Sequence, residues 1–171
     1  MIVVAIMGVL AALAIQGLDQ QKRVASIPTA VAAIKAIGAA EEGYRALNQA
    51  YLDVSVTTGN SGWYPVSNMG SGDNKYGVHA PSHADWPNWR RLNPAITPPL
   101  RVFSYKVNAG LPSTLPTSVT LATTALTISN TVGNEPWYIT QARGDYDGDG
   151  IFSVLVGGSF MPDVKTVNEG E

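Results

Sequence analysis

The sequence predicts an α+β fold in which a long N-terminal α-helix packs on a four-stranded antiparallel β-sheet. Residues 1–55 space their apolar side chains as a helix does, whereas the chain from residue 56 onward is rich in Gly, Pro, Ser, Thr and Asn. Several later stretches alternate apolar and polar residues as half-buried strands do. We therefore divide the 171 residues into a helix, residues 1–55, and a globular β domain, residues 56–171.

The first fifteen residues, MIVVAIMGVLAALAI, contain no polar side chain. A helix that is apolar around its whole circumference must be buried on every side, by lipid or by other protein. Fifteen residues rise about 22 Å, which is short of the roughly 30 Å hydrocarbon core of a bilayer. A signal peptide or a buried core helix is an alternative interpretation. The helical pattern, however, runs on through charged residues, which a cleaved peptide would not need.

We therefore expect copies of this helix to bury one another, and we assign residues 1–23 as an apolar stem for a membrane or a helix bundle. Small residues in the stem allow helices to approach closely. The side chains expected to pack there are Ile2, Val3, Val4, Ile6, Gly8, Val9, Leu10, Leu13 and Ile15.

Residues 24–55 form the amphipathic part of the predicted helix. Its apolar stripe, with spacings of three and four residues, comprises Val24, Ile27, Val31, Ile34, Ile37 or Gly38, Tyr44, Leu47 and Tyr51. Glu41 and Arg45 are four residues apart and are expected to form an intrahelical ion pair. Pro28 is expected to kink the helix or to start a new one. The whole element would be roughly 75 Å long.

The globular part begins with a long irregular connection, residues 56–100, in which turn-forming residues are dense. Trp63, Trp86 and Trp89 are interpreted as core or covering side chains, with a sugar-binding platform as the alternative. Alternation then predicts four strands of an antiparallel meander with one face on the helix and the other in solvent. The strands are placed at 102–110, 118–129, 136–143 and 151–158, so that residues 136–158 form a C-terminal hairpin.

The sequence DYDGDG places three carboxylates, Asp145, Asp147 and Asp149, at alternate positions, as at the start of an EF-hand calcium loop. Ca²⁺ is therefore a candidate ligand, although the twelfth loop position is Val156 and not Glu. The alternative is a tight Asp-Gly hairpin turn. A bound cation would relieve the repulsion among the three carboxylates.

Other chemistry has weaker support in the sequence. His79 and His83, with Asp85 nearby, would suit a zinc site on a helix, but Pro81 lies between them and a surface loop is the simpler interpretation. The chain has no cysteine, no basic block, no phosphate-binding Gly loop and no nucleophile-elbow motif. With a net charge of −2, it is not expected to bind nucleic acid, and we do not expect an enzyme.

The N-terminal run is similar to the same segment of type IV pilins and type II secretion pseudopilins. Residues 39–55, AAEEGYRALNQAYLDVS, resemble the end of that family's long helix, and the remaining two-thirds resembles more loosely the large pilins of delta-proteobacteria with a GDxDGDG-type hairpin. The resemblance implies a subunit that is anchored in the inner membrane before assembly. The pilus assembly machinery would then incorporate it into a helical homopolymer on the cell surface. Residues Ile2 to Ile15 would form the filament core. Adhesion or motility would be the role.

Three features depart from the family. The chain begins inside the family's mature start, so the peptidase site, the methylated Phe and the pairing glutamate have no counterpart here. Gln16 stands where the family usually has Pro, although Gly17 allows a local break. The C-terminal cysteine pair is absent. The alternative assignments are a minor pilin or pseudopilin of a secretion or DNA-uptake system, and a membrane-anchored adhesin-type binding module.

Overall fold

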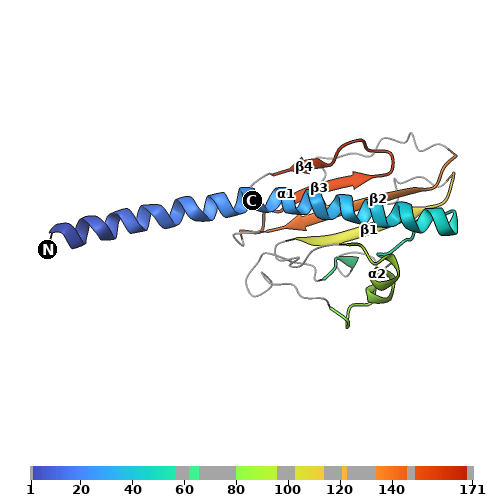
Figure 1. The fold of residues 1–171 in the computed structure, drawn as a ribbon, viewed down its shortest axis with the longest axis horizontal. Coiled ribbons are helices and arrows are strands. Elements are labelled where there is room, and N and C mark those ends of the chain that lie inside the picture. The colour runs from blue at the N-terminus through green and yellow to red at the C-terminus, as the bar shows by residue number, and fades with distance from the viewer. Residues whose placement is uncertain are drawn as a thin grey trace.

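The computed structural model describes residues 2–56, 62–65, 80–95, 103–113, 121–122, 134–145 and 149–168. Within α1 the exposure of side chains is described for Met7 and from Ser26 onward. The elements in chain order are α1 (Ile2–Asn48), α2 (Trp86–Leu92), β1 (Ser104–Gly110), β2 (Trp137–Gly144), β3 (Ser153–Gly158) and β4 (Lys165–Val167), shown in Figure 1. The four strands form one antiparallel sheet in the order β1-β2-β3-β4. The predicted α+β class, N-terminal helix and four-stranded antiparallel sheet are therefore confirmed.

The helix α1 is continuous through Pro28, so the prediction that a new helix starts there is wrong. Proline removes one backbone hydrogen bond from a helix interior, and Pro28 lies at an exposed position of α1. The helix ends earlier than predicted, at Asn48. Gln49 follows with a left-handed backbone (φ 59°) and reverses the chain.

The second half of α1 shares a core with the sheet. Ala30, Ile34 and Ile37 are buried in one cluster with Val107 of β1 and Leu155 of β3. Ile34 and Ile37 belong to the predicted stripe, and Ala30, which the prediction did not include, lies on the same helical face four residues before Ile34. The stripe does not reach as far as predicted, since the Leu47 side chain is 86% exposed.

The opposite face of the sheet is also buried, contrary to the prediction of a solvent-facing surface. Trp137 and Ile139 of β2 pack with Val154 and Val156 of β3, and each of these side chains is at most 3% exposed. The partly buried side chains that cover them are Leu121, Ala122, Phe152, Phe160 and Met161. The sheet therefore lies between two apolar layers, which is why β2 and β3 are apolar at consecutive positions.

Two elements differ from the sequence prediction. The proposed strand at 118–129 does not lie between its expected neighbours, because β1 pairs directly with β2. Leu121 and Ala122 are described and belong to no strand, while the rest of that segment lies outside the described residues. The fourth strand is instead β4, which was missed because it is only three residues long. The helix α2 was missed because the Pro-rich sequence around it was interpreted as irregular. Its Pro lies in the first turn, where a missing N–H costs nothing.

Candidate functional site

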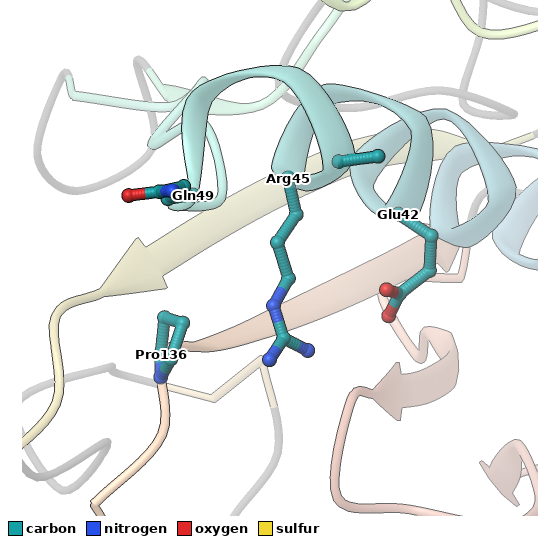
Figure 2. A pocket seen from close by; sticks show the side chains of 5 residues that line it. Glu42, Arg45, Gln49 and Pro136 are labelled. Carbon is teal, nitrogen blue, oxygen red and sulfur yellow. The ribbon is translucent and has the colours of Figure 1, made fainter.

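An open cleft of about 420 Å³ lies where the end of α1 meets the start of β2. Glu42, Arg45, Ala46 and Gln49 line it from α1 and the residue that follows, and Pro136 lines it from the segment that enters β2. Figure 2 shows the Arg45 side chain reaching from α1 toward Pro136. Residues almost ninety positions apart meet here because β2 runs beneath the helix.

Arg45 organises the polar side chains of this cleft. Its Nη1 donates to the hydroxyl of Tyr51 (2.9 Å), and its Nη2 donates to Oε2 of Glu135 (3.3 Å). The Tyr51 hydroxyl in turn donates to Oε1 of Glu42 (2.7 Å). Burial raises the pKa of Tyr51, so its hydroxyl remains a donor at neutral pH. The network connects the chain reversal after α1 to the helix itself and to the segment that enters β2.

The predicted ion pair between Glu41 and Arg45 is wrong, because Glu41 points into the protein. Its side chain is 0% exposed, and its Oε2 accepts a hydrogen bond from the backbone N–H of Leu52 (2.9 Å). Its Oε1 has no hydrogen-bond partner in the described part of the chain. Burial raises the pKa of Glu41 from 4.5 to about 7. The burial of Glu41 could have been predicted from the sequence, because residue 41 falls on the helical face defined by Ile34 and Ile37.

Two of the three candidate calcium ligands lie in the described residues, and each accepts a hydrogen bond from the backbone of its own turn. Asp145, buried at the end of β2, accepts from the N–H of Gly150 (3.1 Å), and Asp149 accepts from the N–H of Ile151 (2.7 Å). Gly150 has a φ of 90°, which favours glycine. Asp147 lies outside the described residues, within which no group of three acidic or histidine side chains is placed to hold a metal. Calcium binding therefore stays a prediction.

His83 has protein partners at both ring nitrogens. Its Nδ1 accepts from the backbone N–H of Asp85 (3.1 Å), so its Nε2 carries the proton and lies 3.1 Å from the carbonyl oxygen of Trp63. His79 lies outside the described residues. Because its nitrogens are engaged, His83 connects the loop that precedes α2 to residue 63 and offers no lone pair to zinc in this arrangement.

The tryptophans predicted as core or covering side chains are buried or half-buried. Trp63 and Trp89 are each 4% exposed, and Trp86 is half-buried. Tyr64 stacks with Trp89 at 5.0 Å and with Trp86 at 6.0 Å between ring centroids. A sugar-binding platform needs exposed ring faces, which Trp63 and Trp89 do not offer.

The predicted helix-packing residues, from Ile2 to Ile15, lie in the first half of α1, but their side-chain positions are outside the described part of the structure. Within the part that is described, we find no helix of sufficient length and apolarity to span a bilayer. Comparison with known protein families, with curated proteins and with solved structures gives no match.

Proposed function

We propose that this chain is the structural subunit of a type IV pilus-like surface filament, which polymerises by bundling its apolar N-terminal helix. The observation that carries the proposal is the fifteen-residue run without a polar side chain at the start of a helix that continues into the globular fold. A long helix with its second half on an antiparallel sheet is the "lollipop" shape expected of such a subunit. Adhesion or motility is the role that the resemblance favours.

The position of α1 relative to the sheet supports this proposal. Side chains of its second half, from Ile27 to Tyr44, belong to or pack on the core cluster. In Figure 1 the first half of the helix extends past the sheet. The sheet thus lies beside the second half of α1 and not beside the first. Neighbouring copies would provide the burial that the apolar run requires.

The energy at stake keeps this run out of water. Burying one Val, Leu or Ile side chain stabilises by roughly 1.5–3 kcal/mol relative to water, so exposing a run of this composition would cost on the order of 10 kcal/mol. Because lipid already buries the run, its association with other copies would depend on close packing of its small residues. Before assembly the same surface would be held in the inner membrane. A calcium ion at Asp145, Asp147 and Asp149 would strengthen the C-terminal hairpin in place of the family's disulfide.

Electron microscopy of sheared cell-surface material tests the proposal. Long filaments composed mainly of this chain are expected. Trace amounts in filaments made of another protein would indicate a minor pilin or pseudopilin, and a membrane-bound chain without filaments would indicate the adhesin-type alternative.

A truncated chain tests the assembly force itself. Removing residues 1–22 should give a soluble monomer, with the full chain as the control under the same conditions. If the truncated chain still polymerised, bundling of the apolar helix would not be the force that assembles the filament.

A further inference from the structure

The hydrogen bond from Leu52 to Glu41 joins α1 to the segment that follows it. Glu41 lies on the helix face that packs against the sheet, and Leu52 lies beyond the reversal at Gln49. Three residues further on, Ser55 pairs with β1 through its backbone N–H, which donates to the carbonyl oxygen of Val107 (2.8 Å). The Glu41 carboxyl therefore sits at the point where the helix is fastened to the sheet-forming chain.

Among the described residues, no cation acts to compensate a charge on Glu41. The titratable groups that neighbouring elements bring to this end of α1 are Glu42, Arg45, Tyr51, Asp53, Arg91 and Tyr138. Asp53 and Glu42 are acidic and act against ionisation of Glu41. The guanidinium of Arg45 is bound to Tyr51 and Glu135, and that of Arg91 to Tyr44. The strand β3, SVLVGG, contributes no titratable group.

We propose that Glu41 is a proton-controlled latch, which fastens the chain reversal at residues 48–52 when it is protonated and opens the reversal when it is ionised. An ionised carboxylate needs several donors, and this one has a single N–H while its Oε1 has none. Glu42 and Gln49, next to Glu41 and within the reversal, are exposed, whereas Ile37, one turn before Glu41 on α1, is buried in the core with Leu155. Opening of the reversal would therefore bring water to the Glu41 carboxylate.

The sign of the pH dependence follows from the two protonation equilibria. Burial holds the pKa of Glu41 at about 7 in the closed state, against 4.5 for the hydrated group. The open state therefore loses its proton first, and the open fraction grows as pH rises from 4.5 to about 7. Above that range both states are ionised and the open fraction levels off. The total increase is about 300-fold. This behaviour belongs to the folded subunit and does not depend on what the subunit assembles into.

Amide hydrogen exchange of the full chain in detergent micelles tests the latch. The protection factor of the Leu52 amide, corrected for the intrinsic pH dependence of exchange, should fall roughly tenfold per pH unit between about pH 5 and about pH 7. The Tyr105 amide of β1, which donates to the carbonyl oxygen of Tyr64 (2.7 Å) and not to residues 48–55, serves as the control and should keep a pH-independent protection factor.

Two variants complete the experiment. Glu41→Gln keeps an acceptor for Leu52 but does not titrate, so its Leu52 protection should be flat with pH. Glu42→Gln changes the adjacent exposed carboxylate and should retain the pH-dependent fall. Constant protection of Leu52 in the natural chain, or a fall shared equally by Tyr105, would overturn the proposal, even if Glu41→Gln failed to fold. The same slope in Glu41→Gln as in the natural chain would also overturn it.

Discussion

Two glycines on α1 allow the contact between the helix and β2 to be tested with one chemical change. Replacing a helical Gly with Ala raises stability by about 1 kcal/mol where space permits. A Cβ at Gly43 would meet nothing within 4 Å, so Gly43→Ala should give that gain. A Cβ at Gly38 would lie 2.7 Å from the hydroxyl oxygen of Tyr138, which is too close. That ring also packs edge-on against Tyr51, at 4.8 Å between centroids, which limits its freedom to move.

The overlap at Gly38 should cost about 1–3 kcal/mol, as insertion of a methyl group into a packed interface does. Gly38→Ala is therefore expected to be less stable than Gly43→Ala by about 1–3 kcal/mol, although both gain the same helical propensity. Removing the hydroxyl with Tyr138→Phe leaves a ring atom at 3.6 Å, an ordinary contact distance. In that background Gly38→Ala should become as favourable as Gly43→Ala.

Denaturant unfolding in detergent, followed by circular dichroism, measures the free energy of unfolding of the natural full chain and of these four variants. The coupling between residues 38 and 138 is obtained from the double-mutant cycle. If Gly38→Ala and Gly43→Ala changed stability equally, or if Tyr138→Phe failed to restore the gain at residue 38, the close approach of α1 to β2 described here would be wrong.

Three further measurements address the core, the buried acid and the calcium prediction. The Leu155 side chain is 0% exposed, so Leu155→Ala should lower the free energy of unfolding by about 2–5 kcal/mol. The Leu47 side chain is 86% exposed, so Leu47→Ala should change that free energy by less than about 0.5 kcal/mol. Equal losses in the two variants would contradict the assigned core. Because the folded chain retains the Glu41 proton up to about pH 7 while the unfolded chain releases it near 4.5, the natural chain should lose stability across that range. Glu41→Gln should abolish most of that loss, worth at most about 3 kcal/mol, and a parallel pH profile in the variant would refute the assignment. If Asp145 and Asp149 help to bind Ca²⁺, millimolar Ca²⁺ should raise the midpoint of a calorimetric melt relative to EGTA, and an unchanged midpoint would exclude binding.

Much of the architecture could be predicted from local pattern. The alternation in residues 102–110, 136–143 and 151–158 placed β1, β2 and β3 to within a few residues, because successive side chains of a strand point to opposite faces and the sequence shows this as alternating residue types. The stripe on α1 likewise predicted Ile34 and Ile37 as core residues. Short elements were missed, since the three residues of β4 carry no periodicity of their own.

The candidate site was not predictable in the same way. Arg45 was expected to pair with Glu41 because the two are four residues apart on a helix. The fold instead brings Glu135 to Arg45 across ninety residues and turns Glu41 toward the core. Which carboxylate an arginine meets depends on the position of the next element in space, and sequence spacing contains no information about that position.

By itself the sequence determined the class of the fold, the apolar character of residues 1–15, and which face of α1 is buried, because periodicity and composition act within a few residues of one another. Only the tertiary structure decided that both faces of the sheet are covered, that His83 is engaged at both nitrogens, and that Glu41 is buried with one donor. These properties arise where distant segments exclude water from the same group, and desolvation is a consequence of the whole fold.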